Sequence, residues 1–83
     1  MDRHSSREVV PTPAAITKAR LTARLTRVEF ALVIGVTHTT IGRWERGEST
    51  PRGLQLISLD AALEAIRKLG PVNDQINHLI KAV

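Results

Sequence analysis

Two helix start signals and two helix stop signals alternate within residues 25–47. The first start signal is the Thr-x-x-Glu pattern of Thr26 and Glu29, a capping box in which each side chain accepts a hydrogen bond from an unpaired backbone N–H. Gly35 then ends the helix where a left-handed backbone is needed. A second start signal follows almost at once at Thr37, and a second glycine stops that helix. The pattern predicts two short helices joined by a tight turn.

Charge is distributed unevenly along the 83 residues. Twelve Lys and Arg against eight Asp and Glu give a net charge of +4, and nine of the twelve bases are arginine. The whole excess lies in residues 1–53, because residues 54–83 contain three bases and three acids. Arginine suits phosphate oxygens and base edges because its guanidinium is a planar fork of donors. A basic half beside a neutral, apolar half therefore favours a nucleic-acid surface next to a packing or assembly element.

The composition argues against several other classes of function. Cysteine is absent, which excludes disulfides, cysteine-based zinc sites and thiol catalysis, and makes a cytoplasmic location the default expectation. No secretory signal and no apolar run of about 18 residues is visible. His4, His38 and His78 are too widely spaced for a metal site, and no nucleophile–base pair or phosphate-binding glycine loop appears. We expect no enzymatic activity, no metal and no cofactor.

The N-terminal part of the chain is predicted to form an arm and a helix. Residues 1–13 contain two prolines and no sustained periodicity, which predicts a flexible or loosely docked arm. Residues 14–24 have apolar side chains at helical spacing. The basic side chains of this helix, Lys18, Arg20 and Arg24, are expected to face solvent or an anion.

A fourth helix is predicted after the loop that follows Gly47. Thr50 is expected to cap it, with Pro51 at its first position, and Gly70 and Pro71 end it. Its large aliphatic side chains cover most of its circumference, so the helix is expected to bury more than one face.

The last segment, residues 70–83, repeats apolar side chains at i, i+3, i+4 and i+7. These residues are Ile76, Leu79, Ile80 and Val83. They fit two interpretations, a stripe that closes the core of the monomer or a two-fold interface between copies of the chain. Because the fourth helix already supplies many aliphatic side chains to a small domain, we favour a C-terminal dimerisation helix.

The helix predicted from His38 has two unlike sides. Thr40, Ile41 and Trp44 share one side, and Trp44 is expected to pack in the core. The opposite side is polar and basic and contains no large apolar residue, as expected of a helix that enters the major groove. Gly42 lies on this polar side. It indicates either a close approach to DNA or a position where nothing packs.

The signals in residues 25–51 resemble a known family when they are taken in one register. The matching runs are Leu25-Thr26-Arg27-Val28-Glu29-Phe30-Ala31, Ile34-Gly35-Val36-Thr37, Thr40-Ile41-Gly42-Arg43-Trp44-Glu45-Arg46-Gly47 and Pro51. They resemble the Cro/C1-type (XRE) DNA-binding domain over roughly residues 14–66. The resemblance implies a lambda-repressor-like helix-turn-helix DNA-binding domain, at 14–69. With the dimerisation helix predicted at 70–83 from its apolar spacing, the expected fold is all-α with five helices.

The resemblance also implies contacts with DNA. It places base contacts at His38, Thr39 and Arg43, where the arginine fork suits guanine O6 and N7. Phosphate contacts are expected from residues near the helix starts and ends, namely Arg27, Thr37, Thr40, Arg46, Thr50 and Arg52. The family usually has glutamine at the position of Arg27, and the arginine is expected to shift this contact wholly to phosphate.

Three functions remain open from the sequence. We favour a homodimeric transcriptional repressor of the plasmid or phage type that binds an inverted-repeat operator in double-stranded DNA, in the bacterial cytoplasm and nucleoid. The alternative is the antitoxin of a type II toxin–antitoxin pair, in which the same DNA-binding core is autoregulatory and the arm or the C-terminal helix docks on a toxin. A small helical adaptor is the third. Membrane attachment is not expected.

Overall fold

Four helices make up the computed structural model, which describes residues 10–71. They are α1 (Pro13–Thr22), α2 (Arg27–Ile34), α3 (His38–Glu45) and α4 (Gly53–Leu69). The described residues contain no strand, so the expected all-α class is confirmed for this part of the chain. The predicted fifth helix at 72–83 and residues 1–9 of the predicted arm lie outside the described residues.

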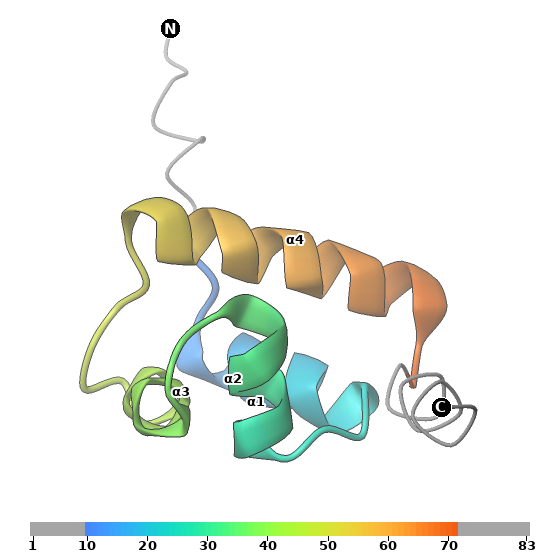
Figure 1. Ribbon diagram of the computed structural model, residues 1–83, viewed down its shortest axis with the longest axis horizontal. Coiled ribbons are helices and arrows are strands. Elements are labelled where there is room, and N and C mark those ends of the chain that lie inside the picture. Colours follow the sequence, from blue (N-terminus) through green and yellow to red (C-terminus); the bar gives the residue numbers. More distant parts are fainter. Residues whose placement is uncertain (1–9, 72–83) are drawn as a thin grey trace, which may run out of the picture.

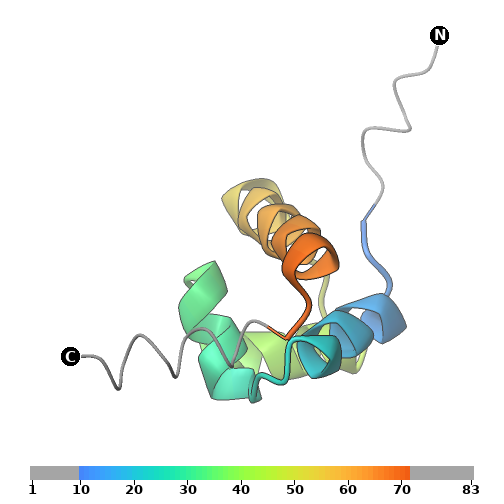
Figure 2. The same cartoon turned by 90° about the vertical axis from the view of Figure 1, so that its right-hand side faces the viewer.

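The longest helix, α4, runs along one side of the other three helices (Figure 1). The second view shows α4 alone on its side, with α1, α2 and α3 together opposite it (Figure 2). Both α1 and α2 pack against α3 and also against α4. Because two helices brace α3, its position is fixed relative to the rest of the domain.

A single apolar core lies between α4 and the other helices. Its buried residues are Ile16, Ala23, Leu25, Phe30, Ala31, Ile34, Ile41, Trp44, Leu59, Ala62 and Ile66. Trp44 is buried as the sequence predicted. Ile41 and Trp44 hold one side of α3 in this core, so the opposite side of α3 faces outward.

The predicted arm is too long at its C-terminal end. Pro13 begins α1, and the Thr12 Oγ1 accepts a hydrogen bond from the Ala15 N–H at 3.1 Å. Thr12 and Pro13 therefore form an N-cap followed by proline at the first helical position, where its missing N–H costs nothing. Val10 and Pro11 are half-buried.

The predicted start of the fourth helix is also wrong. Thr50 does not cap α4, which begins at Gly53 after an extended Arg52 that makes no side-chain capping bond. Pro51 is buried and lines a hollow beside Trp44. Pro51 therefore lies in the loop before α4 and is not its first residue.

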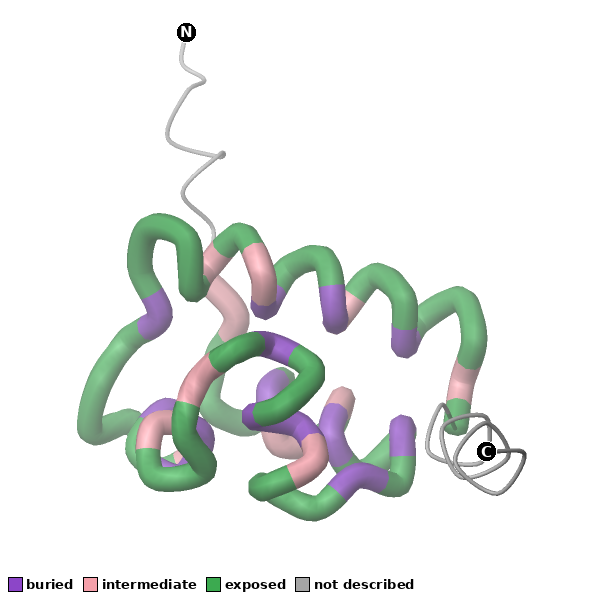
Figure 3. Tube along the Cα trace, viewed as in Figure 1, coloured by how far each residue is buried: buried purple, intermediate pink, exposed green. Residues whose placement is uncertain are grey.

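One side of α4 is buried and the other is exposed. Leu59, Ala62 and Ile66 face the core, whereas Leu54 and Ile57 are 81% and 64% exposed. Figure 3 shows this division, with the buried turns of α4 facing the other helices. Contacts within residues 10–71 thus bury only one face of the helix, and the expected burial of a second face stays a prediction. None of the helices in this range is long and apolar enough to span a membrane.

Candidate nucleic-acid interface

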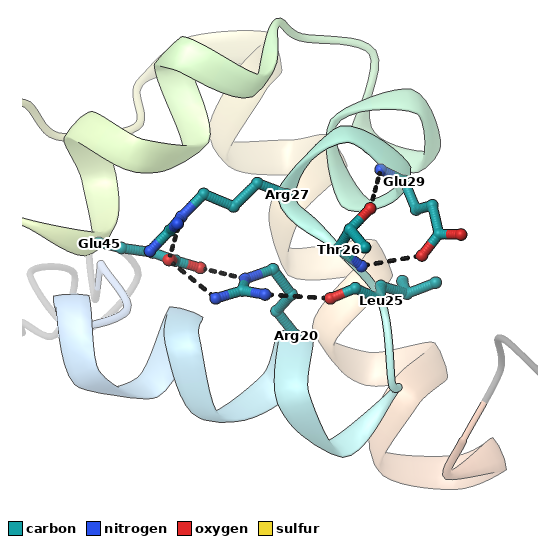
Figure 4. Close-up of polar contacts among 6 residues, drawn as sticks. All are labelled: Arg20, Leu25, Thr26, Arg27, Glu29 and Glu45. Atoms are coloured by element: carbon teal, nitrogen blue, oxygen red, sulfur yellow. Dashed lines mark hydrogen bonds and ion pairs between the residues drawn. The ribbon is translucent and has the colours of Figure 1, made fainter.

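The turn between α2 and α3 forms as the sequence predicted. Thr26 Oγ1 accepts from the Glu29 N–H at 3.1 Å, and Glu29 Oε1 accepts from the Thr26 N–H at 2.8 Å (Figure 4). Gly35 has a φ of 92°, a left-handed value that glycine adopts without strain. Thr37 Oγ1 then accepts from the Thr40 N–H at 3.2 Å. These bonds fix the angle at which α3 leaves α2.

The outward side of α3 presents the three residues predicted to contact bases. His38, Thr39 and Arg43 are all exposed. They share this side with Arg46, which is exposed, and with Gly42. Because the side carries no large apolar group, it is a polar, basic surface on a helix that the core holds in place.

The predicted phosphate contacts do not all lie in one environment. Thr37, Thr50 and Arg52 are exposed, whereas Thr40 is half-buried and its hydroxyl lies 3.0 Å from that of Thr37. Arg27 is exposed at the first position of α2. The four residues predicted to form the dimer interface lie outside the described residues.

A carboxylate that sequence analysis overlooked connects α3 to the two helices that brace it. Glu45 Oε2 accepts from Arg20 Nε at 2.6 Å, and Glu45 Oε1 accepts from Arg20 Nη2 at 3.2 Å and from Arg27 Nε at 2.9 Å (Figure 4). The side chains of Glu45 and Arg20 are only 3% and 11% exposed. Arg20 Nη1 also donates to the Leu25 carbonyl at 3.0 Å. This buried ion pair couples α1, α2 and α3.

The expected solvent-facing role of Arg20 is therefore wrong. Arg20 lies four residues after Ile16 and three before Ala23, so it shares their buried side of α1. That spacing was the available signal in the sequence. The buried guanidinium is tolerated because the carboxylate and the carbonyl accept three hydrogen bonds from it.

Glu45 is held in its ionised form. Burial raises the pKa of its carboxyl, but the hydrogen bonds from Arg20 and Arg27 together with their positive charges outweigh burial, so the pKa is lowered from 4.5. The charge of Arg27 would be unfavourable at a helix N-terminus by itself, and Glu45 offsets it. Arg27 donates its Nε–H to Glu45, and its guanidinium has four further N–H donors.

Arg46 lies against Gly42 on the outward side of α3. A Cβ atom added to Gly42 would lie 3.0 Å from Arg46 Nη1, and Gly42 is buried although its neighbours on this side are exposed. The interpretation that nothing packs at this position is therefore wrong. Glu48 Oε2 accepts from Arg46 Nε at 2.8 Å and Glu48 Oε1 accepts from Arg46 Nη2 at 3.2 Å. The hydrogen bond from Arg46 lowers the pKa of Glu48.

No group of three potential metal ligands occurs among residues 10–71. Three carboxylates of the described residues, Glu45, Glu48 and Glu64, are ion-paired with arginine.

Comparison with known proteins identifies the same region. A protein-family model described as helix-turn-helix matches residues 16–67. The match includes α2 and α3 completely, α1 without its first turn and α4 without its last residues. No curated protein matches the chain.

Proposed function

Because the chain belongs to the Cro/C1-type family of helix-turn-helix DNA-binding transcription regulators, we propose that it is a sequence-specific repressor that binds a palindromic operator as a homodimer. The observation that carries the proposal is the outward side of α3, which is polar and basic while Ile41 and Trp44 hold its other side in the core. The major groove is about 12 Å wide and admits one helix of this kind.

The bases are read from the first turns of α3. His38 and Thr39 lie at its start, and Arg43 lies one turn further along the same side. Arg43 donates its fork to guanine O6 and N7, His38 donates to an acceptor, and Thr39 bonds a base edge or packs its methyl group on thymine.

The phosphates are bound by residues around this helix. They are Arg27, Thr37, Thr40, Thr50 and Arg52. The N-termini of α2 and α3 also point unpaired amide groups at the backbone of DNA. These contacts set the register of α3 in the groove without selecting a sequence.

A dimer is proposed because one α3 helix reaches only a few base pairs, too few to select a sequence by itself. Two recognition helices about 34 Å apart read successive major-groove faces of a palindrome. Ile76, Leu79, Ile80 and Val83 form the two-fold interface in this proposal. Several large aliphatic side chains of α2 and α4 are exposed, among them Leu32 and Leu54, and burial of such side chains would favour an assembled form.

The proposed function is tested by selection from random duplexes. We expect the chain to enrich an inverted repeat, and to lower expression of a reporter when that repeat overlaps the promoter. Enrichment of no sequence, with no salt-dependent binding to duplex DNA, would contradict the proposal and favour a protein partner.

Arg43→Ala is expected to relax the preference at one base pair of each half-site. The loss of a bidentate contact to guanine costs about 1–3 kcal/mol of discrimination. Fluorescence anisotropy on the selected duplex and its single-base variants measures the change.

Two variants serve as comparisons for Arg43→Ala. Arg27→Ala is expected to weaken all duplexes alike and to reduce the salt slope by about one unit. Arg67→Ala removes an exposed arginine of α4 and should change neither quantity appreciably. If Arg43→Ala weakens every duplex equally, Arg43 is a phosphate contact.

Ile80→Asp is expected to convert the dimer to monomers, because a carboxylate in an apolar interface is desolvated without a partner. Sedimentation velocity measures the change. Asn77→Asp adds the same charge away from the apolar stripe and should leave the dimer intact. A dimer that persists in Ile80→Asp would move the interface elsewhere.

A further inference from the structure

The side chain of Arg46 occupies the middle of the outward side of α3. Residues 42 and 46 are one turn apart, and side chains of helices point back toward the N-terminus over the preceding turn. Arg46 follows this rule, because its Nη1 lies 3.0 Å from where a Cβ of Gly42 would be. The guanidinium therefore lies over the turn of Gly42, beside the side on which His38, Thr39 and Arg43 are exposed.

Glu48 occupies one edge of this guanidinium and leaves another edge open. A guanidinium has five N–H donors, one on Nε and two on each Nη. Glu48 accepts from Nε and from Nη2. Both N–H groups of Nη1 and one of Nη2 remain, and these form the end of the fork. Two parallel donors at this end match the paired acceptors O6 and N7 of guanine.

The charge of Glu48 discriminates between two possible DNA ligands for Arg46. A phosphate that approaches the pair meets the negative carboxylate beside the guanidinium, and like charges repel. A base edge carries no net charge, so its partly negative acceptors meet much less repulsion than a phosphate does. The Arg46–Glu48 pair is thus better suited to a base edge than to the backbone.

Resting on the proposed function above, we infer that Arg46 is a further specificity-determining residue that reads a base edge. Gly42 leaves room for its guanidinium to lie against the helix, and Glu48 orients the guanidinium through its hydrogen bonds. This replaces the phosphate contact that the sequence suggested for Arg46. It also assigns a role to Gly42, since a Cβ at that position would lie 3.0 Å from Arg46 Nη1 and would force the guanidinium to shift.

The test compares Arg46→Lys with Arg67→Lys in selection from random duplexes. Lysine keeps the positive charge, and so keeps a phosphate contact, but it lacks the planar fork. Arg67 is a matched control, because it is an exposed arginine that is also paired with a glutamate, Glu64, but lies on α4. We expect Arg46→Lys to lose about 5- to 100-fold discrimination at one base pair of each half-site, with the salt slope unchanged. Arg67→Lys should retain the full preference.

Gly42→Ala provides a second, independent variant. Alanine favours the helix more than glycine does, so the thermal midpoint should not fall. The preference at the same base pair should nevertheless weaken, because the Cβ displaces Nη1. In the variant with both changes, Gly42→Ala should add little to the effect of Arg46→Lys, since both act on one contact.

The possible results separate the inference from the function on which it rests. If the unaltered chain selects a sequence and Arg46→Lys selects the same one equally well, Arg46 is a phosphate or structural residue and the inference is overturned. A Gly42→Ala variant that keeps the full preference would show that Gly42 is not needed to position the guanidinium of Arg46. If the unaltered chain selects no sequence, the proposed function fails, and this inference fails with it.

Discussion

Glu45→Ala is expected to destabilise the domain by about 3–5 kcal/mol, because it leaves a buried arginine without its counter-charge. The carboxylate accepts three hydrogen bonds, from Arg20 Nε, Arg20 Nη2 and Arg27 Nε. Arg20 cannot move into water without disturbing α1, whose side it shares with buried Ile16. Since small domains are stable by only about 5–15 kcal/mol, the variant should be largely unfolded on mild heating. Urea unfolding followed by circular dichroism measures the loss.

Glu64→Ala is the matched control for this prediction. Glu64 is also ion-paired, with Arg67 and Lys68, but all three side chains are at least half exposed. Exposed pairs contribute little because water screens them, so this variant should unfold at nearly the same urea concentration as the unaltered chain. Equal losses in the two variants would mean that Glu45 acts as a surface charge and does not couple the helices.

The same ion pair makes stability depend on pH in a known direction. The pKa of Glu45 is lowered from 4.5 in the folded state, so its stabilising effect is fully present above this value. The effect is lost as the pH falls below 4.5 and through the folded pKa, because protons then bind the unfolded chain more tightly. Glu45→Gln lacks this contribution, so the difference in stability between the two proteins should shrink in acid. A difference that stays constant with pH would contradict the assignment.

Local signals account for the parts of the fold that the sequence predicted correctly. Thr26, Glu29 and Gly35 act within a few residues of themselves, through capping bonds and a left-handed turn. The burial of Trp44 follows equally from helical spacing. These local interactions were sufficient to predict the turn between α2 and α3 and the side of α3 that faces outward.

The errors occurred where distant contacts decide the structure. Thr50 and Pro51 carry a sound local start signal, yet Pro51 is buried at a hollow that Trp44 also lines, and α4 begins only at Gly53. From its neighbours in sequence, Arg20 is expected to be a solvated basic side chain. In the structure it is paired with Glu45, which is 25 residues away in the sequence. Neither packing partner can be identified from the residues adjacent in sequence.

The candidate site shows the same limit. His38, Thr39 and Arg43 were placed on the outward side of α3 by periodicity alone, and they are exposed. The position of the Arg46 guanidinium against Gly42 was not predicted, because it depends on a side-chain conformation that Glu48 selects from beyond the end of the helix. The spacing of residue types along a helix predicts which face a residue occupies. It does not predict the position of the functional group at the end of a long side chain.

Phe30→Ala is expected to cost about 3–5 kcal/mol, as is typical when a buried aromatic side chain is removed from a core. Phe30 is 0% exposed and is among the largest fully buried side chains of the described chain. It lies on α2, which packs against both α3 and α4. The cavity should therefore also weaken the packing of α2 against α3. The single tryptophan, Trp44, is itself buried and reports the loss through the shift of its fluorescence in urea.

Leu32→Ala separates the effect of burial from that of losing an apolar side chain. Leu32 lies on the same helix but is 77% exposed, so its removal leaves no cavity in the monomer and should change stability by less than about 0.5 kcal/mol. The comparison also examines the outer surface of α2. A cost near that of Phe30→Ala, falling as the protein is diluted, would show that a second copy covers Leu32, because the stability of a dimer depends on its concentration. An equal cost at every concentration would instead contradict the assignment of Leu32 to the surface.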